Sequence, residues 1–225
     1  SALRKASYEL GVPLTSHGPY YINLNAREQD KIDSSVERII QTAKISDLCG
    51  AESMTFHAAF YMKDSPYDVF DLVEKSMNVI EERLNRLDIE IELRPELTGK
   101  TSQFGSLEEL INLTKSVMSV KPCMDFSHLY ARTGEYNSYD EIKTVLDKLE
   151  EEIGPTALKN MHIHVSGISS NSKGDLKHLN LEKSDFNWKE MLRALKEKDC
   201  GGYVVSNSPN LEEDAVMLKN YYMAL

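Results

Sequence analysis

Short extended runs alternate with amphipathic helical segments along the whole 225-residue chain, and no linker or low-complexity segment interrupts them. This alternation is typical of an α/β fold with a parallel sheet. Six strands with covering helices leave two architectures open, a doubly wound open sheet and most of an eight-stranded barrel. The extended runs are predicted, in chain order, at Val12–His17, Ser53–His57, Ile89–Arg94, Val120–Asp125, Asn160–Val165 and Gly202–Ser206.

The segments between these runs carry recognisable helix signals. Ser65 and Pro66 predict the N-cap and the first position of a helix. Ser106 and Ser138 each stand three residues before a glutamate, which is the spacing of a capping box. Further helices are predicted at Asp33–Asp47, Asn187–Lys196 and Leu211–Leu225.

The third predicted strand favours the barrel over the open sheet. Side chains of a strand alternate between its two faces, and here one face carries Glu90, Glu92, Arg94 and Glu96 while the other is apolar. Strands of a doubly wound sheet are covered by helices on both faces and read as continuous apolar runs. One polar face therefore indicates a barrel with a polar interior and a site where the strands end.

Composition and charge exclude several classes of protein. With 41% hydrophobic and 28% charged residues, the chain is globular rather than disordered or fibrous. No apolar run approaches the roughly 20 residues of a membrane helix, and no signal core follows Ser1, so we expect a cytoplasmic location. The three cysteines are too widely spaced for a disulfide framework. A net charge of 26 − 36 = −10 argues against coating nucleic acid by bulk electrostatics.

Histidines and carboxylates gather at the ends of the predicted strands. Strand C-termini converge in an α/β barrel, so these side chains are expected to share one pocket. Converging imidazoles and carboxylates repel one another or need desolvation unless a cation lies among them, and zinc is the first candidate for such ligands. The residues in question are His17, His57, Glu96, Asp125 and His162.

In this order the motifs resemble the endonuclease IV group of abasic-site nucleases, within the xylose-isomerase-like barrels. The most specific match is Cys123–His128, which has the pattern Cys-x-Asp-x-x-His. The other matching segments are His17–Leu24, Phe56–His57, Pro95–Leu110, Met161–Ser166 and His178–Leu181. The resemblance implies a TIM (β/α)8-type barrel that hydrolyses the phosphodiester 5′ to an abasic site in double-stranded DNA.

The resemblance also implies a centre of up to three zinc ions. Its ligands would be, in chain order, His17, His57, Glu96, Asp125, His128, His162, Asp175 and His178. The first three would hold one ion, Glu96 would bridge to a second held with Asp125 and His162, and the rest would hold the third. Glu96 would also steer the attacking water. Tyr20, Tyr21 and Asn23 match the segment that contacts DNA.

This sequence departs from the family pattern at the last two metal sites. Asn207 stands where the family has a glutamate ligand of the second ion, and a neutral amide binds a cation more weakly than a carboxylate. Asp175 precedes His178 by three residues, one more than in the family's Asp-x-His. Glu182-Lys183-Ser184 replaces a Gly-x-Gly segment.

The first two strand–helix units of the family would precede Ser1. We therefore expect one xylose-isomerase-like barrel domain over residues 1–225, N-terminally incomplete, with about six strands. Its exposed sheet edges would favour oligomerisation or a partner that completes the barrel. Two other functions stay open: a metal-dependent sugar isomerase or epimerase of the same superfamily, and a degenerate DNA-binding homologue without turnover, which Asn207 and Asp175 motivate.

Overall fold

The computed structural model describes the backbone of residues 1–225 and every side chain except that of Leu176. By its internal contacts the chain divides into an N-terminal unit, Ser1–Glu96 with Ser102–Lys121, and a C-terminal unit, Leu97–Thr101 with Pro122–Leu225. All six predicted strands are present, as β1 (Leu14–His17), β2 (Ala51–Phe56), β3 (Glu92–Pro95), β4 (Cys123–Asp125), β5 (Met161–Val165) and β8 (Gly202–Ser206). The single-barrel expectation for residues 1–225 stays a prediction.

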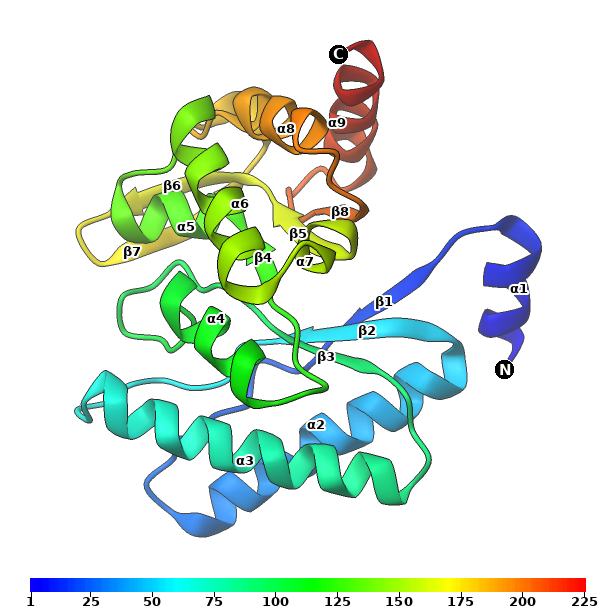
Figure 1. Ribbon diagram of the computed structural model, residues 1–225, viewed down its shortest axis with the longest axis vertical. Helices are drawn as coiled ribbons and strands as arrows, with labels where there is room; N and C mark the ends of the chain where they lie inside the picture. The colour runs from blue at the N-terminus through cyan, green and yellow to red at the C-terminus, as the bar shows by residue number, and fades with distance from the viewer. The chain divides into compact units, whose positions relative to one another are not determined.

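The N-terminal unit is a parallel sheet of order β1-β2-β3. Helices α2 (Gln29–Cys49) and α3 (Pro66–Arg86) lie along one face of this sheet, as Figure 1 shows. Helix α4 (Leu107–Ser116) packs against α3, and α1 (Ala2–Leu10) contacts α2. The predicted helix Asp33–Asp47 thus forms as the longer α2, and α3 begins at Pro66 after the predicted N-cap Ser65.

The two faces of this sheet differ sharply in polarity. Met54 and Leu93 pair across β2 and β3 on the helix-covered face, and both are fully buried. On the other face Thr55 pairs with Arg94, which is only 2% exposed and whose guanidinium forms an ion pair with Glu92. The predicted polar face is therefore confirmed within β3, where Arg94 is buried and Glu92 is half-buried, whereas Glu90 lies before the strand and is exposed.

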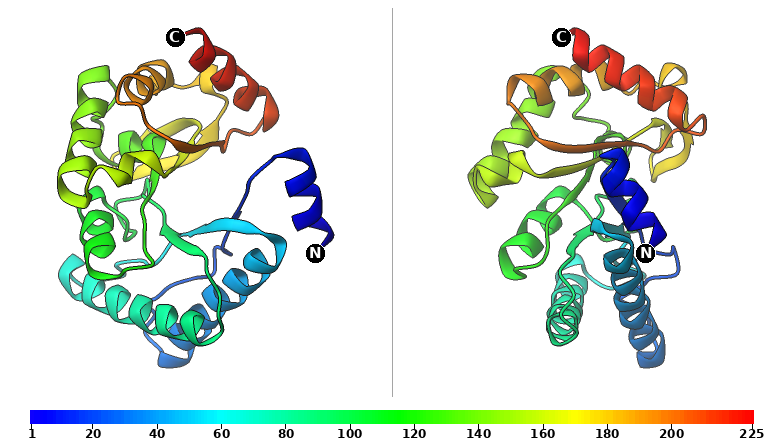
Figure 2. Two further views of the ribbon diagram at one scale, coloured as in Figure 1. Left: turned by 45° about the vertical axis from the view of Figure 1, so that its right-hand side comes forward. Right: turned by 90° about the vertical axis from the view of Figure 1, so that its right-hand side faces the viewer.

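The C-terminal unit contains a second parallel sheet, of order β4-β5-β8, and an antiparallel hairpin of β6 (Gly167–Asn171) and β7 (Gly174–Leu179). Helix α6 packs against α8, and α9 contacts both α8 and β8 (Figure 2). The helical segments are α5 (Phe126–Thr133), α6 (Tyr139–Ile153), α7 (Thr156–Lys159), the 3₁₀ turn η1 (Leu181–Lys183), α8 (Trp188–Glu197) and α9 (Glu212–Ala224).

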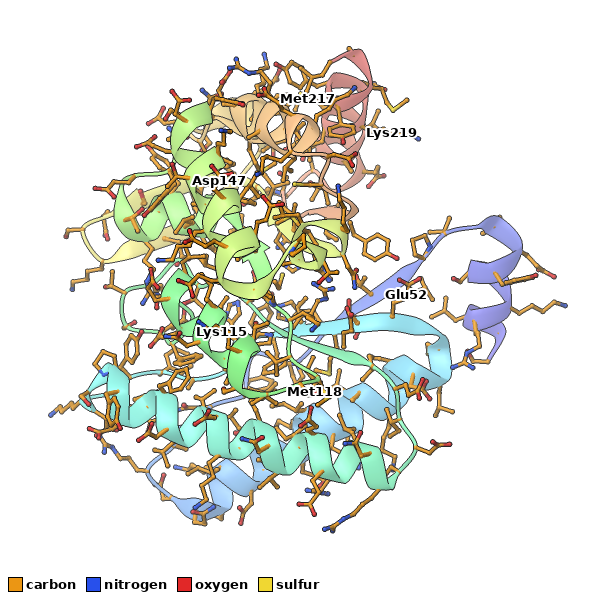
Figure 3. The ribbon with its side chains drawn as sticks, in the orientation of Figure 1. Glu52, Lys115, Met118, Asp147, Met217 and Lys219 are labelled. Carbon is orange, nitrogen blue, oxygen red and sulfur yellow. The ribbon has the colours of Figure 1, made fainter. Side chains whose placement is uncertain are left out.

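Local capping signals fix where the helices begin. Ser106 and Ser138 both form complete capping boxes, each with the glutamate three residues on. The Oγ atom of Ser65 accepts from the N–H of Asp68 at the start of α3. After α8, Lys198 ties the chain back to α6 through ion pairs to Glu150 and to Asp147, which Figure 3 labels.

The elements α1, α5, α7, η1 and the β6–β7 hairpin are not among the sequence-based predictions. The predicted strand Val120–Asp125 shortens to β4, because Pro122 has no N–H to donate to a ladder, and helix α5 begins directly after Asp125. In the part of the chain described here, no helix is both long and apolar enough to cross a bilayer.

Candidate metal centre

Three potential ligands of the N-terminal unit stand at the ends of adjacent parallel strands. His17 is the last residue of β1, His57 follows β2 and Glu96 follows β3. Because parallel strands present their C-terminal ends at one edge, the three side chains converge. One ligand atom from each lies within 4.8 Å of the others. The Oε2 atom of Glu96 is 3.0 Å from Nε2 of His17 and 3.3 Å from Nε2 of His57.

The surroundings orient these ligands. Glu96 is only 2% exposed, and its N–H donates to the carbonyl of Phe56 at 3.0 Å, so its backbone is anchored to β2. The Nδ1 atom of His17 lies 2.6 Å from the carbonyl oxygen of Gly18, which directs Nε2 toward Glu96. A metal-bound histidine characteristically donates its second ring nitrogen in this way. Two imidazole nitrogens and a buried carboxylate fit a divalent metal such as zinc.

An exposed aromatic side chain borders this group. The ring of Tyr20 lies 5.2 Å from that of His17 and 5.6 Å from that of His57, measured between centroids. Tyr20 is 74% exposed and Tyr21 is 80% exposed. Both predicted DNA-contacting tyrosines are therefore on the surface of the N-terminal unit, and Tyr20 lies beside the candidate ligands.

Asn23, the third residue predicted to contact DNA, is engaged with the protein backbone. Its Oδ1 atom accepts from the N–H groups of Asn25 and Phe60, each at 3.1 Å. Asn25 in turn donates to Asp64 at 3.0 Å, and this bond, with help from Arg27, holds the pKa of Asp64 below its usual value. Asn23 thus fixes the loop that carries the tyrosines.

A second group lies on one face of the β4–β5 pair in the C-terminal unit. Cys123 pairs with His162 and Asp125 pairs with His164, so all four side chains share one face. All four are buried, with at most 4% exposed. One ligand atom from each of Cys123, His162 and His164 lies within 4.8 Å of the others.

Asp125 uses its two carboxylate oxygens differently. Oδ1 accepts from the N–H of His128 at 2.8 Å and caps helix α5. Oδ2 is fully buried and has no hydrogen-bond partner among the described residues, while Nδ1 of His128 lies 3.4 Å from it. A buried carboxylate oxygen is costly unless a cation or donor satisfies it, so this atom too fits a metal ligand.

His128 and His178 face each other in the same unit. Their Nε2 atoms are 3.2 Å apart, while Nδ1 of His128 lies 3.0 Å from the carbonyl of Leu97 and Nδ1 of His178 lies 3.1 Å from that of Asn207. With each Nδ1 donating to its carbonyl, both Nε2 atoms present lone pairs to each other. A cation, or a proton on one of the two rings, would relieve that repulsion.

The extra residue before His178 is absorbed by an irregularity in the hairpin. Ser170 pairs with Asp175, whereas the adjacent Ser169 pairs with Lys177 and Ile168 with His178. Asp175 and His178 therefore oppose residues on the same face of β6, as a regular Asp-x-His strand would place them.

The carboxylate of Asp175 packs over Gly99, where an added Cβ would lie 2.6 Å from Oδ1. Among the described residues, neither Asp175 nor the His128–His178 pair belongs to a group of three ligand atoms within 4.8 Å. Asn207 follows β8, and its N–H donates to the carbonyl of Val165 at 2.8 Å.

Sequence reasoning left His164 out of the site. It placed Cys123 on the same strand face as Asp125, from which Cys123 could approach the metals, but favoured the role of a small buried filler. The strand period of two likewise puts His164 on the face of His162. What the pattern alone lacked was the register that sets these two pairs side by side.

Comparison with known sequences identifies relatives over the whole chain. An uncharacterised protein of Methanocaldococcus jannaschii is 40% identical over 225 residues, which are 100% of this chain and 82% of that protein. A probable endonuclease 4 of Aster yellows witches'-broom phytoplasma is 23% identical over 186 residues. That match spans 81% of this chain and only 62% of that protein.

Solved structures with the same fold carry names from two enzyme classes. A D-tagatose 3-epimerase-like protein has a TM-score of 0.76 at 19% identity, with 99% of this chain and 81% of that one covered. Endonuclease IV from Thermus thermophilus has a TM-score of 0.72 at 23% identity, with 100% of this chain and 80% of that one covered. A family match extends over residues 1–220. The chain belongs to the xylose isomerase-like TIM barrel family.

Proposed function

We propose that this chain is a metal-dependent hydrolase of DNA repair that cleaves the phosphodiester 5′ to an abasic site. The observation that carries the proposal is the convergence of His17, His57 and Glu96 at one edge of a sheet, beside the exposed ring of Tyr20. The probable endonuclease 4 that is 23% identical over 81% of this chain supports the same reaction class.

The ligands of the N-terminal unit have separate tasks in this proposal. Divalent metals bound by such ligands lower the pKa of water to about 7 and polarise phosphoryl oxygens. Glu96 lies between the imidazoles of His17 and His57 and orients the attacking water. The hydrogen bond from His17 to the carbonyl of Gly18 keeps that ring in place. Further zinc ions are proposed in the C-terminal unit on Asp125, His128, His162, Asp175 and His178.

Duplex DNA is the proposed partner, and the tyrosines supply its contact. Exposed aromatic rings stack on nucleobases, at about 1–3 kcal/mol per stacked base. Tyr20 and Tyr21 are exposed on a loop that Asn23 pins to the backbone, so their rings can meet a base without a large loss of loop entropy.

The first test is incision of a labelled duplex that contains one abasic site, with and without a chelator. We expect chelator-sensitive cleavage by the chain and a loss of cleavage in His57→Ala. Asn207→Glu should raise cleavage, because it restores an anionic oxygen to the metal site. The substitution should leave the local backbone intact, because the hydrogen bonds of residue 207 involve its main-chain N–H and carbonyl. Absence of cleavage by the chain and by Asn207→Glu would refute the proposed activity.

Two equally exposed tyrosines provide a matched pair for the DNA contact. Tyr20 is 74% exposed beside the candidate ligands, and Tyr67 is 73% exposed at the start of α3. Tyr20→Ala should weaken binding of abasic duplex, whereas Tyr67→Ala should leave it unchanged. Equal effects of the two substitutions would contradict the assigned contact.

The net charge of −10 favours a second candidate, a sugar isomerase or epimerase, because an acidic chain repels duplex DNA at long range. Salt dependence distinguishes the two candidates. A DNA-binding chain loses affinity steeply as salt rises, since phosphate contacts release counterions. A sugar enzyme should show no salt-dependent affinity for duplex and should convert a ketose or aldose in a substrate screen.

A further inference from the structure

We propose that Cys123, His162 and His164 form a metal site that uses a thiolate ligand. This inference goes beyond the proposed hydrolase, whose ligands are imidazoles and carboxylates, although it shares His162 with that set. Its basis is geometric: Sγ of Cys123 and one ring nitrogen from each histidine lie within 4.8 Å of one another.

The parallel ladder holds this geometry in place. Cys123 is paired with His162 in the β4–β5 register, and His164 is the next residue on the same face of β5. The rings of His162 and His164 meet edge to face, with centroids 5.0 Å apart. Because all three side chains rise from regular strands, a metal would meet ligands that are already positioned.

The face on which Cys123 lies argues against a role as hydrophobic filler. A filler cysteine belongs with the apolar side chains, and on β4 and β5 these are Met124 and Ile163, which share the opposite face. Cys123 instead lies with Asp125, whose buried Oδ2 atom has no hydrogen-bond partner among the described residues. Two independent features of this face therefore point to a cation.

The donor set selects the kind of cation. A thiolate with two imidazoles suits zinc and its tetrahedral substitute cobalt, whereas magnesium and calcium require oxygen ligands. Three protein ligands leave one coordination position open. Binding breaks the S–H bond of Cys123, forms a sulfur–metal bond and releases the proton to water, so no further reactant is needed.

Cobalt titration of the metal-free full chain tests this site directly. The assay uses the Cys49→Ser/Cys200→Ser background, in which Cys123 is the remaining thiol. Burial raises the pKa of Cys200 to about 11, so its thiol binds metal poorly and its removal should not lower the amount of metal bound. We expect a near-ultraviolet sulfur-to-cobalt charge-transfer band that saturates at one thiolate-bound ion per chain.

Two variants locate the band. Cys123→Ser replaces sulfur by oxygen and should abolish the band, with zinc affinity falling by more than the roughly 10–100-fold typical for loss of an outer-shell partner. His57→Ala, in the N-terminal unit, should retain the band. Cobalt binding without the band, or a band that survives Cys123→Ser, would overturn the proposal.

A second measurement needs no substitution. X-ray absorption of the zinc-loaded chain should show a sulfur ligand at about 2.3 Å from zinc, and a spectrum with nitrogen and oxygen ligands alone would refute the site. Neither readout involves DNA cleavage. A sulfur ligand without abasic-site incision would uphold this inference and reject the proposed hydrolase. Incision without a sulfur ligand would reject this inference and uphold the hydrolase.

Discussion

A single side chain of this protein can stabilise the fold with one atom and offer another atom to a ligand. Asp125 is the clearest case, because one oxygen caps α5 and the other is buried without a hydrogen-bond partner among the described residues. Asp214 is the contrasting case. It is 2% exposed, yet Oδ2 accepts from the N–H of Leu181 at 2.8 Å and Oδ1 from Asn210 at 2.9 Å, so its role is structural.

Asp125→Asn should separate the two roles of that residue. Asparagine caps helices about as well as aspartate, so the thermal midpoint of the metal-free protein should barely change. Zinc affinity should fall at least tenfold, because a neutral amide replaces a carboxylate. Competition with a chromophoric chelator measures the affinity, and Asp125→Ala, which loses both contacts, should lower both quantities. Unchanged zinc binding in Asp125→Asn would exclude the residue as a ligand.

Asp214 should make stability depend on pH in the acid range. Burial raises the pKa of this carboxyl, but hydrogen bonds from Ser208, Asn210 and the N–H of Leu181 outweigh it and hold the pKa below its usual value. A depressed folded pKa contributes stability above the unfolded value of about 3.9, and that stability is lost as pH falls through the folded value.

Urea unfolding at two pH values checks the sign of this effect. At pH 7 Asp214→Asn should cost about 1–3 kcal/mol, the range for a hydrogen-bonded charged group. The difference from the parent chain should shrink as pH falls below about 4, where Asp214 is protonated in the unfolded chain, and should be lost below its lower folded pKa. A difference that grows toward acid pH would show that Asp214 is not held ionised by these bonds.

At the scale of elements, strand ends and one irregular hairpin decide where the donors lie. The β6–β7 register absorbs one residue between Ser169 and Ser170, which returns Asp175 to the face of His178. Asp175 is held there from both sides, since its N–H donates to the carbonyl of Gly99 at 3.2 Å and its side chain packs on the Gly99 Cα. The helix starts, by contrast, depend on capping residues within a single turn.

Gly99→Ala should therefore disturb the hairpin. The new Cβ would lie 2.6 Å from Oδ1 and 2.8 Å from Cβ of Asp175, so the carboxylate must move as a whole. We expect a loss of about 1–3 kcal/mol of stability, as for other overpacked sites. Denaturant unfolding of Gly99→Ala, Asp175→Gly and the double variant measures the coupling, which should be favourable because Asp175→Gly removes the obstructing atoms. Additive effects would contradict the contact.

On the scale of the whole molecule, both units share one arrangement. Each contains a pair of parallel strands, β2–β3 or β4–β5, with apolar side chains on one face and buried polar side chains on the other, and potential metal ligands lie on or directly after the polar face. Glu96 and Asp125 are carboxylates with at most 2% exposed, and burying such groups without a counter-charge costs stability. A bound cation offsets that cost in the folded state alone, because the ligands come from segments far apart in the sequence.

Zinc should accordingly stabilise the folded chain. A ligand that binds the native state adds about 2.7 kcal/mol at a free concentration 100 times its dissociation constant. Calorimetry should show a midpoint that rises with zinc and returns with a chelator. His57→Ala should lose part of the increment, and Tyr67→Ala, at the exposed start of α3 and not a candidate ligand, should keep all of it. A zinc-independent midpoint would exclude metal binding by these groups.

Sequence alone determined the features that depend on a few neighbouring residues. Alternation in β3 placed Arg94 and Glu96 on a polar inner face, and capping boxes at Ser106 and Ser138 set two helix starts. Both kinds of signal arise within one turn or one strand. They can therefore be recognised before the neighbouring elements are known.

Only the tertiary structure decided which donors meet. The β4–β5 register brought Cys123 to His162, and the hairpin irregularity brought Asp175 to the face of His178. Both depend on pairing between segments distant in sequence, and a shift of one residue in such a pairing moves a side chain to the opposite face. The sequence thus specified which residues could bind a metal, and the pairing of the strands specified which of them lie close together.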